Sequence, residues 1–510
     1  MPMKNWTNTA FGFYYKQRYK IIQRYMHHPD VVQKEVLNGL LKSARYTEFG
    51  RKYDFRSIHN SSTYANRIPI QDYEAFKPYI QRMMHGEKDV LWDGRVNYFS
   101  KSSGTTSAKS KFLPVSRQSL KRCHTRGSWD AMTMLYHNRP DATIFSNKNM
   151  VMGGSIEKFG PYPKTEFGDV SGFLIRNIPA IARPFFAIDF ETALMGEWEE
   201  KLERLAHIGA NTSNITMIGG VPTWTVVLFR RILELTGKDN LLEVWPDFQV
   251  YMHGGVSFAP YRTQFNQFLP SDQVSFQEIY NASEGYFAAQ DDFSDPGMLL
   301  LLNNGIYFEF MPMEEWGKED PKALPIWEVE KDKNYAVVIS TNSGLWRYSL
   351  GDTVSFTSVH PYRIKVTGRT KQYVNAFGEE VMVANTDKAL TMACEETQAQ
   401  VKDYTVAPIY FAGSGQGGHE WLIEFKVPPV NLEYFRALLD QNLQNINSDY
   451  EAKRYKDIAL KKLTLKVLPE GSFNDWLRSK GKYGGQHKVP RLANHRKYVE
   501  EILYFLGEEV

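Results

Sequence analysis

Residues 215–237 read ITMIGGVPTWTVVLFRRILELTG, and this stretch decides the fold class. The apolar run 215–218 predicts a short strand, and the glycines and proline that follow it predict a turn into a helix. That helix ends at Gly237, a residue type that commonly closes helices. Its apolar stripe consists of Trp224, Val227, Leu228, Ile232 and Leu235. The stretch therefore predicts one strand followed by one amphipathic helix.

The same alternation extends in both directions from this unit. The further predicted elements are a helical face with Trp198, Leu202 and Leu205, and strands at 248–252, 274–279, 306–311 and 335–339. Strands that alternate with helices form βαβ units. We therefore predict an α/β fold, in which a large N-terminal domain of βαβ units contains largely parallel sheets.

The pattern changes after about Gly368. The predicted order becomes helix, strand, strand, helix, strand, with bounds near 383–396, 406–411, 421–425, 432–443 and 463–467. Such a unit of about 140 residues has the size of a small domain. We therefore predict two domains, residues 1–369 and a small mobile α/β domain of residues 370–510, joined by an exposed hinge near Thr370-Lys371.

Composition excludes several classes of protein. The 510 residues include 61 Lys and Arg against 58 Asp and Glu, and a net charge of +3 is too balanced for an electrostatic nucleic-acid binder. No apolar run reaches the ~18 to 20 residues of a membrane helix. Two cysteines cannot form a disulfide framework or a zinc site. Because residues 1–20 lack the apolar segment of a secretory signal, we expect a cytoplasmic protein without an evident obligate protein partner.

Common catalytic signatures are mostly absent, including H-E-x-x-H, C-x-x-C, G-x-S-x-G and the P-loop motif. Gly413, Gly415 and Gly418 match G-x-G-x-x-G. The residues after them, 421–425, alternate between apolar and polar types, which predicts a strand rather than the helix that a dinucleotide site requires. We interpret these glycines as part of a hairpin loop.

Residues 102–111 read SSGTTSAKSK. Hydroxyl side chains are a poor choice for a packed core, because each buried hydroxyl needs a hydrogen-bond partner. As a loop, this segment presents hydroxyls, backbone N–H groups and two ammonium groups to one point, which suits a polyphosphate. The alternative is a solvated turn between residues 98–99 and 112–113.

Residues 280–285, YNASEG, come directly after the predicted strand 274–279. An acid at the carboxyl end of a parallel strand lies where open α/β sheets bind ligands. A carboxylate beside phosphates requires an intervening cation such as Mg²⁺, because like charges repel. In the alternative interpretation, Ser283 caps a helix and Glu284 lies in its first turn.

Three later segments contain further candidate groups. Asp352 follows Gly351 in the segment 344–354 and can accept hydrogen bonds from both hydroxyls of a ribose, although an Asp in a turn would look the same. Arg369 lies in the segment 367–380. Lys488 lies in the segment 485–491, near the C-terminus.

These five segments occur in an order that resembles the adenylate-forming superfamily, which includes acyl-CoA synthetases and luciferase. Within it, the chain resembles the auxin-responsive-promoter (Gretchen Hagen) family of acyl-acid amido synthetases, from about Tyr46 to Arg491. Supporting segments are 68–74, 78–80, 85–87, 347–352 and 488–491. Ser107 and Asn375 depart from the general superfamily, which has Gly and Lys there. These departures disfavour an acyl-CoA ligase more than an amide-forming enzyme.

The resemblance implies that ATP and a carboxylic acid form acyl-AMP and pyrophosphate, and that an amine, commonly an amino acid, then attacks. It implies that Glu284 ligates Mg²⁺ and that Lys488 lies at the reacting carboxylate and α-phosphate. It also implies that Asp352 holds the ribose and that Arg369 contacts ribose or phosphate. The residues implied to hold the phosphates are Ser102, Ser103, Gly104, Thr105 and Thr106. Those implied to line the nucleotide are Tyr280, Asn281, Ala282 and Ser283.

The walls of the acid pocket are expected at 152–154, in a loop at 160–172, and at 221–224, with Gly154, Val221 and Trp224 as candidate substrate contacts. Aromatic residues make up 14% of the chain, which is compatible with a flat or apolar acyl group. Two other functions remain open: an acyl-CoA ligase that shares the first half-reaction, and a non-catalytic nucleotide-binding protein of the same fold. The presence of Glu284, Asp352 and Lys488 disfavours the non-catalytic protein.

Overall fold

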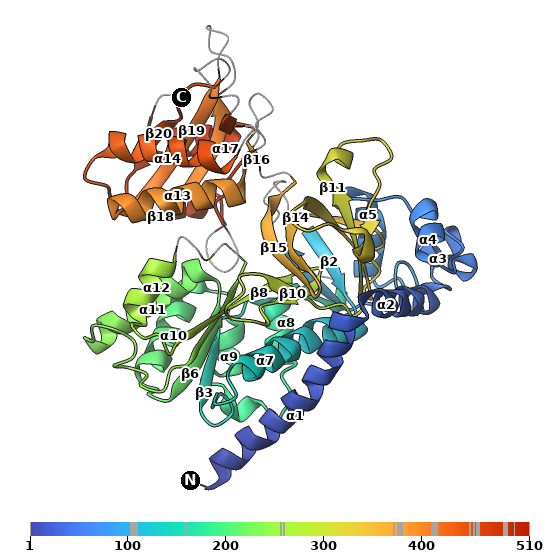
Figure 1. Ribbon diagram of the computed structural model, residues 1–510. Coiled ribbons are helices and arrows are strands. Elements are labelled where there is room, and N and C mark those ends of the chain that lie inside the picture. The colour runs from blue at the N-terminus through green and yellow to red at the C-terminus, as the bar shows by residue number, and fades with distance from the viewer. Residues whose placement is uncertain are drawn as a thin grey trace.

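Figure 1 shows the fold of the chain as a computed structural model. The structure describes residues 2–102, 111–159, 162–255, 258, 261–370, 373–374, 381–409, 417–447, 450–451, 454, 460–482, 488–493 and 495–508. All statements about the fold refer to these residues.

A large mixed sheet forms the centre of the N-terminal part, with eleven strands among the described residues. In spatial order these are β12 (Leu324–Pro325), β11 (Ile306–Pro312), β13 (Asn334–Thr341), β14 (Tyr348–Val359), β15 (Tyr362–Arg369), β10 (Met298–Leu300), β9 (Gly285–Ala289), β8 (Ser275–Ala282), β7 (Val250–Gly254), β6 (Ile215–Gly220) and β3 (Lys148–Val151). The order places strands that are far apart in the chain next to each other, for example β10 beside β15.

The strands β3, β6, β7 and β8 pair in parallel. Helices α10 (Trp198–Ala210), α11 (Pro222–Thr236) and α12 (Arg262–Phe268) lie in the connections between them and group together in Figure 1. The prediction for residues 215–237 is confirmed, because β6 leads into α11 and Gly237 ends that helix with a φ of +64°. This part of the sheet consists of the predicted βαβ units.

The α/β class is confirmed, but the prediction of largely parallel sheets needs correction. From β8 through β9, β10, β15, β14, β13 and β11 to β12, each neighbouring pair is antiparallel. A parallel pair needs a long crossover, whereas antiparallel neighbours can be joined by a tight turn. The residues Ser283 and Glu284 form such a turn between β8 and β9.

A smaller sheet has the order β2 (Lys111–Val115), β1 (Tyr98–Ser102), β5 (Tyr162–Gly168) and β4 (Ile156–Phe159). The predicted loop at 160–172 is therefore wrong for most of its described residues, since β5 and the start of α8 (Val170–Arg176) occupy them. The alternation of β5 is weak in the sequence, and its pairing with β1 and β4 stabilises it as a strand.

The remaining N-terminal helices pack around these sheets. They are α1 (Pro2–His27), α2 (Pro29–Ala44), α3 (Glu48–Lys52), α4 (Ser61–Arg67), α5 (Tyr73–Met84), α6 (Arg117–Ser119), a π-helical turn (Leu120–Thr125), α7 (Arg126–Asn138) and α9 (Phe190–Leu194), with short 3₁₀ turns at 55–57, 183–185, 313–315 and 326–328. The long helix α1 extends along the outside of the N-terminal part to the N-terminus (Figure 1).

The C-terminal part contains the predicted order of helix, strand, strand, helix, strand. Its elements are β16 (Tyr373–Val374), β17 (Val381–Met382), α13 (Val383–Thr397), β18 (Gln400–Ile409), β19 (Gly418–Val427), α14 (Leu432–Ile446), β20 (Thr464–Leu468), α16 (Ser472–Ser479) and α17 (Lys497–Phe505). The strands β18 and β19 pair antiparallel, as a hairpin requires. Gly418 begins β19, whereas Gly413 and Gly415 lie outside the described residues.

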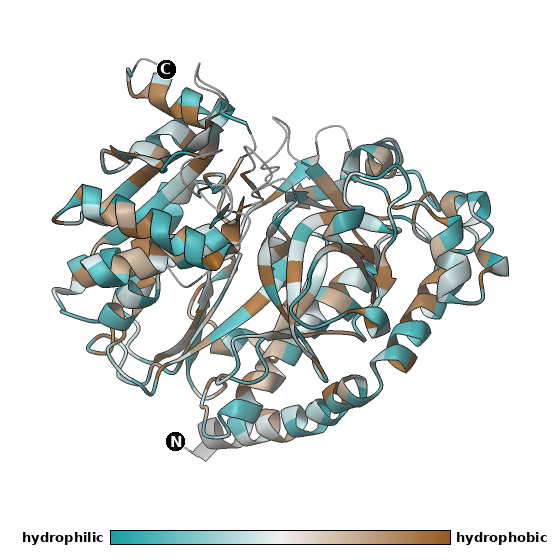
Figure 2. Cartoon of the chain, turned by 45° about the horizontal axis from the view of Figure 1, so that its top comes forward, coloured by the Kyte–Doolittle hydropathy of each residue, from teal (hydrophilic) through white to brown (hydrophobic). Residues whose placement is uncertain are grey.

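The buried apolar residues of the C-terminal part form two clusters of their own, drawn from residues 374–503. The N-terminal part has separate clusters, one around α10 to α12 and a larger one beneath the antiparallel strands. Figure 2 shows both polar and apolar residues on the helices, as expected when one face packs against a core. Among the described helices, none combines the length and apolar character that crossing a membrane requires.

Candidate functional site

A cavity of about 1750 Å³ lies between the carboxyl ends of β6 to β8 and the C-terminal part. Its lining includes Trp224 and Tyr280 from the N-terminal part and Lys488 and Arg491 from the C-terminal part. The carboxyl ends of parallel strands are the usual ligand-binding edge of an open α/β sheet. The position agrees with the site expected after the strand 274–279.

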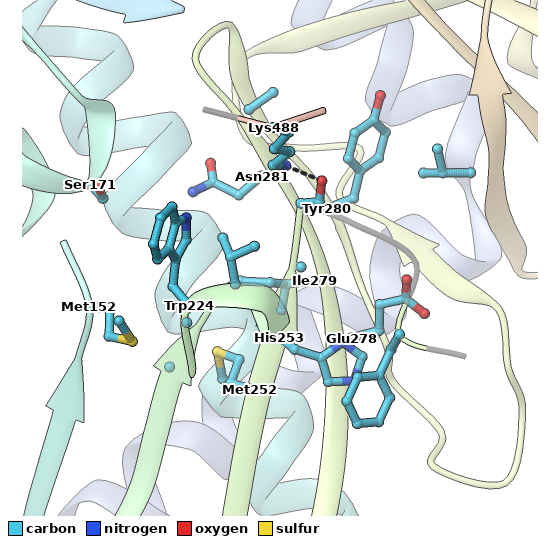
Figure 3. A pocket seen from close by; sticks show the side chains of 18 of the residues that line it. Met152, Ser171, Trp224, Met252, His253, Glu278, Ile279, Tyr280, Asn281 and Lys488 are labelled. Atoms are coloured by element: carbon cyan, nitrogen blue, oxygen red, sulfur yellow. Dashed lines mark hydrogen bonds between the residues drawn. The ribbon is translucent and has the colours of Figure 1, made fainter. Parts of the chain in front are cut away.

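The strand β8 divides this cavity into two branches (Figure 3). Ile279 and Asn281 point to the side of Trp224, whereas Glu278 and Tyr280 point to the opposite side. This separation follows from the two-residue period of a strand, which sends successive side chains to opposite faces. We call the side with Met152, Gly154, Ser171, Trp224 and Ile279 the apolar branch, and the side with Arg262, Glu278, Tyr280, Glu284, Asp352, Lys365 and Arg369 the charged branch.

Asp352 is the best-connected residue of the charged branch. Its Oδ2 accepts a hydrogen bond from the Tyr280 hydroxyl at 2.5 Å, and its Oδ1 pairs with Arg369 Nε at 2.8 Å. Asp352 lies within β14, opposite Arg369 in β15, so the alternative of an Asp in a turn is wrong. Burial, together with the charge of Asp352, raises the pKa of Tyr280 well above 10, so its hydroxyl remains a donor.

Glu284 lies in the tight turn between β8 and β9 and lines the cavity with Ala282 and Ser283. The alternative in which Ser283 caps a helix is therefore wrong, because a strand follows instead. Burial and then the nearby charge of Asp352 raise the pKa of Glu284 to about 7. The negative charge of Asp352 therefore disfavours the ionised form of Glu284.

Lys488 reaches the cavity from the C-terminal part. Its Nζ donates a hydrogen bond to the backbone oxygen of Gly255, the residue that follows β7 (Figure 3). Gly255 has a φ of +82°, and a Cβ atom there would lie 3.1 Å from Lys488 Nζ, so glycine permits this close approach. Burial and then the charge of Arg369 lower the pKa of Lys488 to about 8.

Most of the predicted site residues therefore line one cavity. They are Gly154, Val221, Trp224, Tyr280, Asn281, Ala282, Ser283, Glu284, Asp352, Arg369 and Lys488. Ser102 is the last residue of β1, and its side chain is not described. Ser103, Gly104, Thr105 and Thr106 lie outside the described residues, so their expected contact with phosphates stays a prediction.

Sequence reasoning missed four polar residues that line the charged branch or its border: His253, Arg262, Glu278 and Lys365. Burial raises the pKa of Glu278 to about 7 and lowers the pKa of His253 to about 3. His253 and Glu278 are directly opposite in the pairing of β7 with β8. The strand period, counted back from Tyr280, was the signal that could have found Glu278.

The carboxylates of the charged branch fit a magnesium ion only together with other ligands. Among the described residues, no group of three or more His, Cys, Asp or Glu side chains could hold a metal ion. Mg²⁺ is commonly bound by one or two carboxylates, with phosphate oxygens and water as the remaining ligands. Glu284 provides one such carboxylate; burial and then the charge of Asp352 raise its pKa, and a bound cation would favour its ionised form.

The apolar branch is built from backbone and apolar side chains. Val221 is the N-cap of α11, and Trp224 follows in the first turn of that helix. Gly154 is required by packing, because a Cβ atom there would lie 1.7 Å from Asp169 Oδ2. Of the described residues in the stretch 160–172, Val170 and Ser171 line the cavity. The branch can accept a flat or apolar group.

Sequence profiles of one family match most of the chain. The GH3 family N-terminal domain matches residues 18–274, the central domain matches residues 299–369, and the C-terminal domain matches residues 384–497. The candidate residues Trp224, Asp352 and Lys488 fall in three different profiles.

Relatives and solved structures agree with these profiles. The chain is 22% identical to indole-3-acetic acid-amido synthetase GH3.3 of Arabidopsis thaliana, over 94% of this chain and 92% of that protein. Its fold is similar to the structure of GH3.15 acyl acid amido synthetase, with a TM-score of 0.78, 16% identity and 95% of each chain covered. It also resembles 2-hydroxyisobutyryl-CoA ligase in complex with 2-HIB-AMP, with a TM-score of 0.57, 11% identity and coverage of 93% and 91%.

Proposed function

The chain belongs to the GH3 family, and we propose that it is an ATP-dependent ligase that joins a carboxylic acid to the amino group of an amino acid. The observation that supports this function best is the arrangement around β8. An apolar branch and a charged branch meet where Lys488 contacts Gly255. This arrangement suits a reaction in which an organic acid attacks a nucleotide.

The charged branch binds the nucleotide. A carboxylate has about four acceptor positions, so Asp352 can accept from ribose hydroxyls while it keeps its bonds to Tyr280 and Arg369. Glu278 is two residues from Tyr280 on the same face of β8, about 7 Å along the strand, and its carboxyl oxygens can accept from the amino group of the base. The loop 102–106 is proposed to hold the phosphates.

The first half-reaction joins the acid to AMP. A carboxylate oxygen of the acid forms a bond to the α-phosphorus, and the bond from that phosphorus to the bridging oxygen breaks, which releases pyrophosphate. The Lys488 ammonium group stabilises the negative oxygens that crowd together in the transition state. Mg²⁺, bound with the help of Glu284, would supply charge neutralisation to the phosphates.

The second half-reaction forms the amide. The amino nitrogen attacks the acyl carbon, the bond from that carbon to the AMP oxygen breaks, and the nitrogen loses a proton. We propose that residues 370–510 act as a separate small domain whose rotation separates the two half-reactions, with the boundary at the end of β15. The expected exposed hinge is wrong at Thr370, which is buried and donates its backbone N–H to the Gly351 oxygen, and Lys371 lies outside the described residues. The separate apolar clusters of the C-terminal part support this division.

We propose small-molecule acid and amine substrates, with ATP and Mg²⁺ as cosubstrate and cofactor. The cytoplasmic location stays a prediction from the sequence, as does the absence of an obligate protein partner.

The test is ATP–pyrophosphate exchange with a panel of carboxylic acids, followed by product analysis. Acid-dependent exchange and an amide product with an amino acid are expected. Exchange followed by product only with CoA would identify an acyl-CoA ligase instead. If the protein binds ATP but shows no exchange with any acid of the panel, it is a non-catalytic nucleotide-binding protein.

A further inference from the structure

Two polar side chains lie on the Trp224 side of β8: Asn281 of β8 itself and Ser171 of α8 (Figure 3). Ser171, in the first turn of α8, lines the cavity among Met152, Leu174, Ile175 and Trp224. In Figure 3 Ser171 lies well away from Lys488, on the far side of the branch. Its hydroxyl is therefore placed to meet a part of the acid other than the carboxylate that reacts beside Lys488.

The bonding of Ser171 leaves its hydrogen available. Its Oγ accepts a hydrogen bond from the backbone N–H of Gly154 at 2.9 Å. A hydroxyl has one donor and two acceptor positions. Within the described part of the chain, the structure contains no acceptor for the hydrogen of Ser171. The side chain can therefore donate to a ligand while it accepts from Gly154.

The peptide that holds Ser171 is itself firmly placed. Lys201 is buried, with 2% of its surface exposed. Its Nζ donates hydrogen bonds to the backbone oxygen of Gly153, to that of Ala193 at 2.7 Å and to that of Met195 at 3.3 Å. A buried ammonium group needs all three of its donors satisfied, and these carbonyl groups satisfy them.

Close packing adds to this restraint. A Cβ atom at Gly153 would lie 2.1 Å from the Ile175 side chain, and a Cβ atom at Gly172 would lie 2.8 Å from the Gly154 oxygen. The backbone at 153–154 thus has little room to rotate away from Ser171. The hydroxyl is oriented by the protein before any ligand arrives, which is the arrangement expected of a specificity contact.

We propose that Ser171 donates a hydrogen bond to an acceptor on the acid, so that the pocket selects apolar carboxylic acids with an ether, carbonyl or hydroxyl oxygen remote from the carboxylate. The proposal rests on the function proposed above. An acid without such an acceptor displaces water from Ser171 and leaves its hydrogen unpaired, which weakens binding. An acid with such an acceptor also displaces the water, but it accepts the hydrogen bond from the Ser171 hydroxyl in place of the water.

The test compares acids of equal shape. Phenylacetic and phenylpropanoic acids with a methoxy group at ring position 3 or 4 are paired with the corresponding ethyl compounds, and kcat/KM for each acid is measured by ATP–pyrophosphate exchange. We expect the wild-type protein to prefer at least one methoxy acid over its ethyl partner by about tenfold.

Variants assign the preference to the hydroxyl. Ser171→Thr keeps a hydroxyl and should keep the preference for methoxy acids. Ser171→Val has nearly the same shape as the Thr variant but lacks the hydroxyl, and it should lose the preference. Ser128→Ala is the matched control, because Ser128 also lines the cavity but donates to the backbone oxygen of His124 at 3.0 Å. Ser128→Ala should leave the preference unchanged.

The outcomes separate this proposal from the proposed function. Exchange without any methoxy preference, or a preference that persists in Ser171→Val, overturns the role of Ser171 and leaves the ligase function intact. Absence of exchange with every acid overturns the ligase function and this proposal with it. Thermal melts of the Thr and Val variants show whether both retain the folded state in which the comparison is made.

Discussion

The two faces of β8 differ in chemistry although alternating residues of one short segment form both. Ile279 points to the side of Trp224 (Figure 3), whereas Tyr280 lies beside Asp352 and Arg369, and Glu278 lies beside Lys365. The period of a strand can thus separate an organic acid from a nucleotide across a single backbone. The reacting atoms must then meet at the end of the strand, where Lys488 arrives from the other part of the molecule.

Loss of Lys488 should have the largest effect, because it removes the group that joins the two branches. Lys488→Ala should slow acyl-AMP formation by about 10²- to 10³-fold, by analogy with the loss of one oxyanion donor. ATP binding should weaken much less. Lys497→Ala, on the exposed surface of α17, is the control. Normal adenylation by Lys488→Ala would exclude the role assigned to this residue.

The second half-reaction sharpens that prediction. With acyl-AMP supplied, amide formation by Lys488→Ala should remain close to the wild-type rate, because the proposed rotation of the small domain carries Lys488 away from the α-phosphate before the amine attacks. An equal loss in both half-reactions would show that Lys488 acts in folding or in general substrate binding instead.

The role of Glu284 in binding Mg²⁺ in the charged branch can be tested by removing its charge. Glu284→Gln keeps the size of the side chain but removes the charge that attracts a cation, so the Mg²⁺ concentration for half-maximal exchange should rise at least about tenfold. Glu278→Gln is the matched control on the same branch, and it should change the KM for ATP more than the Mg²⁺ requirement. Wild-type Mg²⁺ dependence in Glu284→Gln would show that Glu284 is only a turn residue.

The pH dependence of exchange follows from the lowered pKa of Lys488, which is about 8 in the folded protein. The ammonium form is present below this pKa and is lost above it, so kcat/KM should fall as the pH rises through about 8, by about tenfold per unit at higher pH. Lys488→Arg keeps its charge throughout and should show a lower but flat profile in this range. A falling limb that persists in Lys488→Arg would assign it to another group.

The smallest effect is expected at an exposed ion pair between the two parts of the molecule. Arg478 of α16 pairs with Glu199 of α10 at 2.6 Å, and both side chains are largely exposed. Exposed ion pairs contribute about 0 to 1 kcal/mol, so Arg478→Ala should change the exchange rate by less than about fivefold. A large loss would show that this pair, rather than Lys488 with Gly255, determines how the C-terminal part is placed.

The sequence predicted those parts of the molecule in which local patterns suffice. The unit 215–237 and the order of elements from 383 to 467 agree with the structure, since amphipathic periods and glycine ends are local signals. The segments around Tyr280, Asp352 and Lys488 were expected to belong to one site, and they line one cavity.

Other features depend on long-range pairing or on ambiguous local signals. Ser283 followed by Glu284 has the same composition at a helix start and in a hairpin turn, and the pairing of β8 with β9 decides between them. The antiparallel half of the sheet depends on partners such as β10 with β15, more than 60 residues apart. The helices α16 and α17 are short and were not predicted.

Glu278 was missed for a different reason. Its strand was recognised by apolar residues, and a single polar residue within it was not assigned to the face that it shares with Tyr280. The structure shows that this face, and not only the strand end, contributes to the charged branch.

The claim that one face of β8 binds the acid and the other binds the nucleotide is tested most directly by comparing two variants, one for each face. KM values for the acid and for ATP are measured separately by exchange in Trp224→Ala and Asp352→Asn. Trp224→Ala should raise the KM for the acid about tenfold or more and leave the KM for ATP near the wild-type value, because it removes apolar contact area. Asp352→Asn should raise the KM for ATP about tenfold or more and leave the KM for the acid near the wild-type value, since it removes the charge that faces Arg369 and the ribose. If both variants raise both KM values by similar factors, the two branches are not separate sites, and the two faces of β8 do not divide the acid from the nucleotide.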